Sequence, residues 1–313
     1  MRVIIVEKNA GQRMDKFLKQ EIFFNEKITR GEIIRNIRAG KVTVNNKKVK
    51  PSYILKKDDK VEINISREAF KLIPNGNIKL DILYKDKNII VINKPAGMIV
   101  HPSLKYENDT LASGLVYRFP EIKTVGDEPS VRPGIVHRLD KDTSGIIVIA
   151  RNQKTFLELK DKFKNHEVKK TYRAIVLGKL KNFSGIINKP MARTADYKKQ
   201  TIASAKSKTK IRPAVTEYKI IKTWNNFSLL EVYPKTGRMH QIRVHLASIG
   251  HAVAGDKKYK PKNIQTDEKI LRQLLHAKKI EFELKEKKFE FEAMPPRDFL
   301  DFAAYLDGKS IKS

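Results

Sequence analysis

The most informative stretch of this chain is Arg132-Pro-Gly-Ile-Val-His-Arg-Leu-Asp-Lys-Asp-Thr-Ser-Gly145, which leads directly into the apolar run Ile146-Ile-Val-Ile149. A continuous run of β-branched residues is typical of a strand that is buried on both faces. A polar loop that ends at such a strand is held rigidly, as a reactive side chain requires. The stretch therefore predicts a buried central strand with a candidate site at its beginning.

Two carboxylates in this loop, Asp140 and Asp142, stand among side chains that carry or can carry positive charge, namely His137, Arg138 and Lys141. Cationic neighbours keep a carboxylate ionised, which is the form that a nucleophile or a general base needs. A plainer interpretation is an Asx-type turn, in which the carboxylates only accept hydrogen bonds from backbone N–H groups. The number of charged neighbours favours a functional site.

A second polar cluster runs Lys235-Thr-Gly-Arg-Met-His-Gln-Ile-Arg-Val-His245, and its later residues have the pattern of a helix start. Gln241 and His245 are spaced i, i+4 and share a helix face, whereas Arg243 points elsewhere. His240 and His245 are five residues apart, which is a poor spacing for a helical metal pair. We therefore expect no metal site in this cluster.

The first 65 residues have the pattern of a small α+β module. Apolar side chains recur at helical spacing over residues 13–23, and Thr29 with Glu32 forms a capping box that opens a second helix ending at Gly40. Asn45-Asn46, between short Val-rich runs, predicts a tight hairpin. Basic side chains gather on and near the second helix, and these are Arg30, Arg35, Arg38 and Lys41. From charge alone, a solvated helix face is as good an interpretation as a binding surface.

Residues 66–78 contain Pro-Asn-Gly and lack periodicity, so we interpret them as a linker between a domain over residues 11–65 and another over residues 79–305. Six apolar stretches of the second domain predict strands, over residues 89–93, 145–150, 172–177, 216–223, 228–233 and 279–284. Helical patterns near residues 154–164 and 240–249 interrupt them. This scattered order predicts an α+β fold with a mixed or antiparallel sheet.

The chain has 313 residues, with 65 Lys and Arg against 35 Asp and Glu and a formal net charge of +30. Such a surplus favours nucleic acid as a partner, although a lysine-biased composition is the alternative. The absence of cysteine excludes a disulfide scaffold, a thiolate metal site and a cysteine nucleophile. No apolar run approaches the roughly 20 residues of a membrane span, and the N-terminus lacks a signal-peptide pattern. We therefore expect a soluble, cytoplasmic protein.

Taken together, the motifs resemble those of the RNA pseudouridine synthases of the ribosomal large-subunit type. The family signature is matched by His137-Arg-Leu-Asp-x-x-Thr-Ser-Gly145, and four other motifs occur in the family's order. They are Lys94-Pro-x-Gly-x-x-x-His-Pro102, Lys170-x-Tyr-x-Ala174, Gly237-Arg-x-His-Gln-Ile-Arg-Val-His245 and Leu275-His-Ala277. Residues 12–65 are similar to the small RNA-binding S4 module that many of these enzymes carry.

The resemblance implies conversion of uridine to pseudouridine in structured RNA, with ribosomal RNA the expected substrate and with no metal or other cofactor. Asp140 takes the position of the family's essential carboxylate. Tyr172 matches the aromatic residue that stacks on the target base, and Arg243 the basic residue that pairs with the carboxylate. Arg138 is a candidate wedge for a flipped nucleotide and Leu275 an apolar pocket wall, and for both a structural role is equally open. We expect a monomer that binds RNA and does not bind membranes.

The sequence departs from the family pattern at Met239, where a small hydroxyl residue is usual. The lost hydroxyl predicts a looser loop around Arg243, unless backbone contacts hold that loop. Two function classes stay open, namely the enzyme and a non-catalytic RNA-binding or ribosome-assembly protein on the same fold. The joint presence of Asp140, Tyr172 and Arg243 favours the enzyme.

Overall fold

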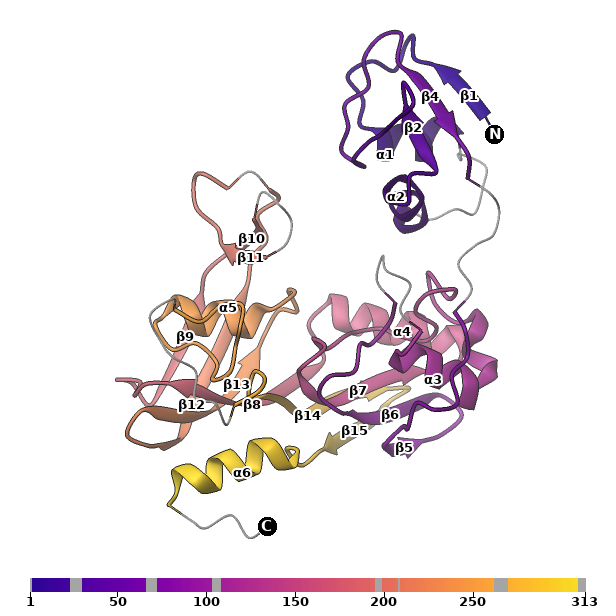
Figure 1. The fold of residues 1–313 in the computed structure, drawn as a ribbon. Helices are drawn as coiled ribbons and strands as arrows, with labels where there is room; N and C mark the ends of the chain where they lie inside the picture. The colour runs from indigo at the N-terminus through magenta and orange to yellow at the C-terminus, as the bar shows by residue number, and fades with distance from the viewer. Residues whose placement is uncertain are drawn as a thin grey trace. The chain divides into compact units, whose positions relative to one another are not determined.

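The computed structural model describes residues 2–22, 30–65, 72–102, 108–194, 199–207, 209–261 and 270–308. The chain divides into two compact units, and the boundary between them falls after Leu72. Each unit has a hydrophobic core of its own. Figure 1 draws the helices and strands of each unit. No helix in the described ranges is long and apolar enough to cross a membrane.

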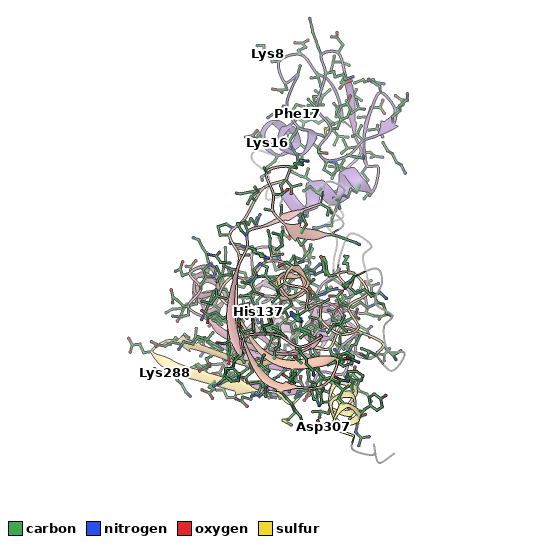
Figure 2. All side chains as sticks on the ribbon, turned by 90° about the vertical axis from the view of Figure 1, so that its left-hand side faces the viewer. Lys8, Lys16, Phe17, His137, Lys288 and Asp307 are labelled. Carbon is green, nitrogen blue, oxygen red and sulfur yellow. The ribbon has the colours of Figure 1, made fainter. Side chains whose placement is uncertain are left out.

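The first unit is a small α+β module, as the sequence predicts. Its antiparallel sheet has the order β1 (Arg2–Ile5), β4 (Lys60–Ile63), β2 (Val42–Val44) and β3 (Lys47–Lys48). Its helices are α1 (Met14–Phe17), which continues as a π-helical segment over Leu18–Ile22, and α2 (Arg30–Arg38). Phe17 of α1 and Ile33 and Ile37 of α2 are buried in the core of this unit, and Figure 2 labels Phe17.

Two turns of the first unit follow from local sequence. Gly40 has a φ of +76°, and the next amide, that of Lys41, donates to the carbonyl of Asn36. This is the left-handed helix end that favours glycine, so α2 stops where the sequence predicts. Asn45 and Asn46 have φ values of +48° and +61°, as a tight hairpin between β2 and β3 requires.

Parts of three predicted local elements lie outside the described residues, namely Phe23 of the first expected helix, Thr29 of the capping box and residues 66–71 of the linker. Residues 73–78 of that expected linker belong instead to the second unit. The amide of Asn75 donates to the carbonyl of Ser113 at 3.0 Å. A packed rather than free segment therefore precedes the first strand of the second unit.

Nine strands of the described residues form the sheet of the second unit. The order is β5 (Ile82–Lys85), β6 (Ile89–Lys94), β7 (Ser144–Ala150), β14 (Leu275–Leu284), β8 (Lys169–Leu177), β13 (Phe227–Pro234), β12 (Val215–Thr223) and β9 (Ser184–Asn188), with β15 (Lys287–Glu292) paired to β14. Only β7 and β14 run parallel among these neighbours. A separate antiparallel pair joins β10 (Met191–Arg193) to β11 (Gln200–Ile202). The mixed sheet confirms the predicted fold class.

Helices cover the sheet on both faces. They are α3 (Leu111–Arg118), a 3₁₀ turn over Pro120–Thr124, α4 (Gln153–Lys164), α5 (Gln241–Ser248) and α6 (Arg297–Leu306). Successive residues of a strand point to opposite faces, so Val176 of β8 shares a core with Leu246 of α5, while Ile175 shares one with Phe299 of α6. Figure 1 shows α5 and α6 on opposite sides of β8 and β13.

Strand β7 fixes the place where the polar loop enters the sheet. All seven of its residues are buried, as the β-branched run predicts. Gly145 has a φ of +114°, and a Cβ atom there would lie 2.2 Å from the carbonyl oxygen of Ala277 in β14. Only glycine allows this close approach of the two parallel strands, and it holds the end of the loop that carries Asp140.

Candidate active site

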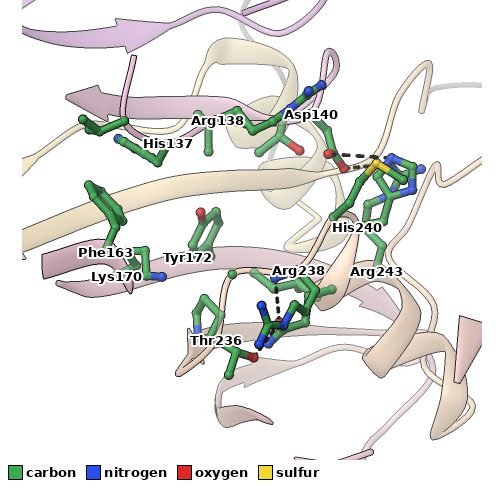
Figure 3. Close-up of a pocket in the computed structure, with 18 of the residues that line it drawn as sticks. His137, Arg138, Asp140, Phe163, Lys170, Tyr172, Thr236, Arg238, His240 and Arg243 are labelled. Atoms are coloured by element: carbon green, nitrogen blue, oxygen red, sulfur yellow. Dashed lines mark hydrogen bonds and ion pairs between the residues drawn. The ribbon is translucent and has the colours of Figure 1, made fainter. Parts of the chain in front are cut away.

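A cleft of about 580 Å³ in the second unit brings the two polar clusters of the sequence together (Figure 3). Asp140 comes from the loop before β7, and Arg243 from the first turn of α5. Tyr172 of β8 and Leu275 of β14 line the same cleft, as does Arg138. Residues far apart in the sequence therefore share one site, and the sequence-predicted candidates of the second unit all lie in it.

Asp140 is paired with Arg243, which is itself held from behind by Asp256. Nη1 of Arg243 donates to Oδ2 of Asp140 at 2.8 Å. Nε and Nη2 of Arg243 donate to the two oxygens of Asp256 at 2.6 and 2.9 Å. Asp256 also accepts the amides of Lys258 and Tyr259, at 2.8 and 3.1 Å. The guanidinium is thus fixed by a bidentate pair and directs its remaining edge at Asp140.

Two members of this triad of Asp140, Arg243 and Asp256 are charged in spite of their burial, namely Arg243 and Asp256. Burial by itself raises the pKa of Asp256, but the hydrogen bonds and charge of Arg243 lower it overall. Burial likewise opposes the charge on Arg243, whose pKa is nevertheless raised by its two carboxylate partners. Asp256 is fully buried, whereas the side chain of Asp140 remains 20% exposed. Asp140 is therefore the member of the triad that a molecule in the cleft can reach.

His137 does not supply the positive charge that the sequence suggested for this loop. Its Nε2 accepts the amide of Val148 at 2.9 Å, and its ring stacks on Phe163 with centroids 4.5 Å apart. Burial lowers the pKa of His137 to about 3, so the ring is neutral. In the described residues no backbone N–H donates to the carboxylate of Asp140, so its partner is Arg243 rather than an Asx-type turn.

Lys94 anchors the Asp140 loop from inside the protein. The side chain is fully buried, and Nζ donates to the carbonyls of Pro95, Met98 and Lys141 at 2.7, 3.0 and 3.0 Å. Three carbonyls use all three donors of an ammonium group. Burial lowers the pKa of Lys94 to about 7. The contacts tie the Lys94 motif to the residue that follows Asp140.

The loop that carries Arg243 is held by Gln241. Oε1 of Gln241 accepts the hydroxyl of Thr236 at 2.7 Å and the amide of Arg238 at 3.0 Å. Its Nε2 donates to the carbonyl of Val215 at 2.9 Å. None of these bonds involves Met239, so the loop is fixed without the hydroxyl that is usual at that position in the family it resembles.

Tyr172 and Leu275 form an apolar part of the cleft. Tyr172 lies opposite Ala277 in the β8–β14 ladder, and Leu275 lies opposite Ala174. Burial raises the pKa of Tyr172 well above its usual value, so the phenol stays neutral. A neutral aromatic ring and a branched aliphatic side chain offer the kind of surface on which a nucleobase stacks.

The rest of the lining is strongly basic. Among the described residues, seven Lys and Arg side chains line the cleft, and they are Arg132, Arg138, Lys164, Lys170, Arg193, Arg238 and Arg243. Asp140 is the one carboxylate among the lining residues that the structure describes. Arg138 is exposed, and its Nη1 lies 3.2 Å from Nε2 of His101. A concave surface with this charge excess attracts a polyanion. No group of three His, Asp or Glu side chains in the described ranges is placed to hold a metal ion.

The basic residues predicted in the first unit lie on and after α2. Arg35 and Arg38 are three positions apart and so neighbour one another on the helix surface, with Arg38 exposed and Arg35 half-buried. Lys41 follows the helix end, and Arg30 begins the helix, with its side chain outside the described part. These positions are compatible with a shared binding surface, which stays a prediction.

An enzyme that acts on nucleic acid needs a reactive group and basic surfaces that bind phosphates. This chain has an ion-paired carboxylate in a basic cleft, and it also has a small basic α+β module. A family model for RNA pseudouridylate synthases matches residues 88–248, and one for the S4 domain matches residues 12–61. The chain therefore belongs to the RNA pseudouridylate synthase family and carries an S4 domain.

Named relatives agree with this assignment. The ribosomal large subunit pseudouridine synthase D of Borreliella burgdorferi is 35% identical over 308 residues, which cover 96% of this chain and 91% of that protein. The ribosomal large subunit pseudouridine synthase C of Buchnera aphidicola is 30% identical and covers 97% and 96%. The structure of human RNA pseudouridylate synthase domain containing 1 has a TM-score of 0.60 at 25% identity, covering 77% of this chain and 93% of that one. The expected family and the enzyme class are confirmed.

Proposed function

We propose that this enzyme converts specific uridines of large-subunit ribosomal RNA to pseudouridine, with Asp140 as its catalytic carboxylate. Two observations support the choice of RNA, namely the S4 domain and the relatives named for the ribosomal large subunit. The observation that carries the choice of Asp140 is its position as the one carboxylate, beside seven cationic side chains, among the described residues that line the cleft.

The reaction breaks the bond between N1 of uracil and C1′ of ribose and forms a bond between C5 and C1′. C5 loses a proton and N1 gains one, so atoms and charge balance and no cofactor is consumed. A carboxylate can attack the ribose, attack the base or assist cleavage of the glycosidic bond, and it must be ionised for each of these roles. The contact of Arg243 with Oδ2 stabilises this ionised form.

Tyr172, Arg138 and Leu275 complete the proposed site. Tyr172 stacks on the flipped uracil, since its neutral ring is better suited to stacking than to proton transfer. Leu275 provides the apolar wall of the pocket. Arg138, exposed at the cleft, takes the place that the flipped base leaves in the RNA stack. The position of each residue in the lining of the cleft supports its proposed role.

The substrate is tested by mapping pseudouridines in total RNA from cells with and without this gene. The proposal expects one or a few sites in large-subunit ribosomal RNA to lose the modification in the deletion strain. Re-expression of the wild-type chain should restore them. Loss of sites confined to transfer RNA would overturn the proposed substrate and leave the enzyme class untouched.

Removing residues 1–65 should weaken RNA binding and reduce its dependence on salt. The first unit has its own core, so the second unit keeps its packing when the first is removed. Each lost phosphate contact lowers the slope of log Kd against log salt by about 0.7 to 0.9. Binding of ribosomal RNA fragments at several salt concentrations measures both quantities. Equal affinity and equal slope for the truncated and full chains would exclude a docking role for the first unit.

A further inference from the structure

The proposed function leaves His240, a cleft residue beside Asp140, without a role. His240 directly precedes α5 and has a left-handed backbone, with φ +57°. Such a conformation costs a non-glycine residue roughly 1–3 kcal/mol and persists only where the surroundings impose it. It turns the imidazole toward the carboxylate, so that Nε2 of His240 lies 3.7 Å from Oδ1 of Asp140 (Figure 3).

Tyr259 holds the opposite edge of the His240 ring. Its Oη lies 2.7 Å from Nδ1 of His240, and the two rings meet edge to face with centroids 5.5 Å apart. The same oxygen accepts the amide of Gln200 at 3.1 Å, and we assign its own hydrogen to the bond with Nδ1. Nδ1 is then the acceptor, and the hydrogen of the neutral ring is on Nε2, the nitrogen that faces Asp140.

The two oxygens of Asp140 therefore face two different donors. Oδ2 accepts from Arg243, and Oδ1 faces Nε2–H of His240. Burial lowers the pKa of His240 to about 4, although the charge of Asp140 opposes this change, so the ring is neutral near pH 7. A separation of 3.7 Å is longer than a hydrogen bond, and contacts of this kind often shorten when substrate is bound.

We propose that His240 is a positioning residue, whose Nε2–H, directed by the hydroxyl of Tyr259, fixes the plane of the Asp140 carboxylate. The inference rests on the proposed function, in which Asp140 is the reacting group. A carboxylate held at one oxygen rotates about its Cβ–Cγ bond, whereas a second donor keeps it in a single plane when the 3.7 Å separation shortens in the substrate complex. Positioning of this kind acts on kcat more than on the binding of RNA.

A double-mutant cycle on His240 and Tyr259 tests this inference. Tyr259→Phe removes the hydroxyl but keeps the ring that packs 5.2 Å from the guanidinium of Arg243. The loss of one hydrogen bond predicts a kcat about 2–10-fold lower with KM unchanged. His240→Asn preserves the left-handed backbone, which asparagine tolerates, and should lower kcat by about 10-fold or more. The double variant should be no slower than His240→Asn alone, because Tyr259 acts only through His240.

If the effects of Tyr259→Phe and His240→Asn on kcat added up in the double variant, the inference would be overturned. A Tyr259→Phe variant with wild-type kcat would also overturn it. Tyr84→Phe is the matched control. It removes the hydroxyl of a tyrosine in β5 that donates to Asp86 at 3.2 Å, outside the cleft, and it should leave kcat unchanged. Asp140→Asn is assayed in parallel. An active Asp140→Asn variant overturns the proposed function itself. If Asp140→Asn is inactive but the effects of the His240 and Tyr259 substitutions are additive, only the role of His240 is overturned.

Nitrogen NMR of the unaltered protein gives a second test that needs no variant to be active. In protein labelled with ¹⁵N-histidine, the His240 signals, assigned by their absence in His240→Asn, should show a neutral ring protonated at Nε2. In Tyr259→Phe the Nδ1 signal should shift, because its donor is gone. A ring protonated at Nδ1 in the unaltered protein would overturn the inference, since Nε2 would then offer Asp140 no hydrogen.

Discussion

Replacing Asp140 with asparagine should abolish pseudouridine formation, with kcat falling on the order of 1000-fold or more. Asparagine has nearly the same shape as aspartate but cannot be ionised, so it cannot attack carbon or stabilise the charge that develops when the glycosidic bond breaks. Arg243 keeps its bidentate partner Asp256 in this variant, so the cleft stays assembled. RNA affinity should change little, because the cationic lining is untouched.

The loss is measured as tritium release from C5 of RNA labelled with 5-³H-uridine, beside RNA affinity measured by filter binding. Asp142→Asn is the matched control. It removes a carboxylate that belongs to the same loop as Asp140 but does not line the cleft. Its kcat should stay within a few-fold of wild type. Pseudouridine formation by Asp140→Asn at the wild-type rate would refute the role given to Asp140.

The central strand of the second unit could be predicted because the sequence pattern that indicates it lies within the strand itself. Strand β7 is buried on both faces, and its consecutive β-branched residues report this directly. Strands β9 to β11 and β15 could not be predicted in the same way, because they are short or rich in charged residues. The parallel pairing of β7 with β14 joins residues more than a hundred positions apart, and no local pattern carries it. Packing, rather than propensity, decides these elements.

The residues of the candidate site also differ in whether a local sequence pattern predicts them. Asp140 and Arg243 each lie in a dense polar motif, which marks their segments as candidates, whereas the pairing of Arg243 with the carboxylate is implied by the family resemblance and not by spacing. Gln241 and His245, spaced i, i+4, share a face, since both contact the hydroxyl of Thr216. Asp256 was missed because it is a lone carboxylate whose importance comes from a contact across the fold. The sequence nevertheless holds a pattern that could have indicated Asp256. This carboxylate follows an apolar run, in the way that Asp140 precedes one.

Replacing Asp256 with asparagine should destabilise the second unit by about 3–5 kcal/mol, the cost of removing one partner from a buried ion pair. Arg243 would keep only Asp140 as a carboxylate partner, and its misplacement should lower kcat on the order of 100-fold. The single tryptophan, Trp224, is partly buried and packs against a core cluster of the second unit, so its fluorescence during urea unfolding reports on that unit. Because the folded-state pKa of Asp256 is lowered, its stabilising effect is present above the unfolded pKa near 3.8 and is lost as pH falls through the lower folded value. The difference between wild type and variant should therefore shrink in acid.

Asp298→Asn separates the effect of burial from the effect of removing any Arg–Asp pair. Asp298 accepts two hydrogen bonds from Arg272, at 2.6 and 2.7 Å, so this pair has the same bidentate geometry as Arg243 with Asp256. The side chain of Asp298 is 49% exposed, however, whereas that of Asp256 is fully buried. Water compensates an exposed pair, so Asp298→Asn should cost at most about 1 kcal/mol and leave kcat unchanged. Equal losses in the two variants would mean that the geometry of the pair, and not the burial of the Arg243 charge, sets the stability of the site.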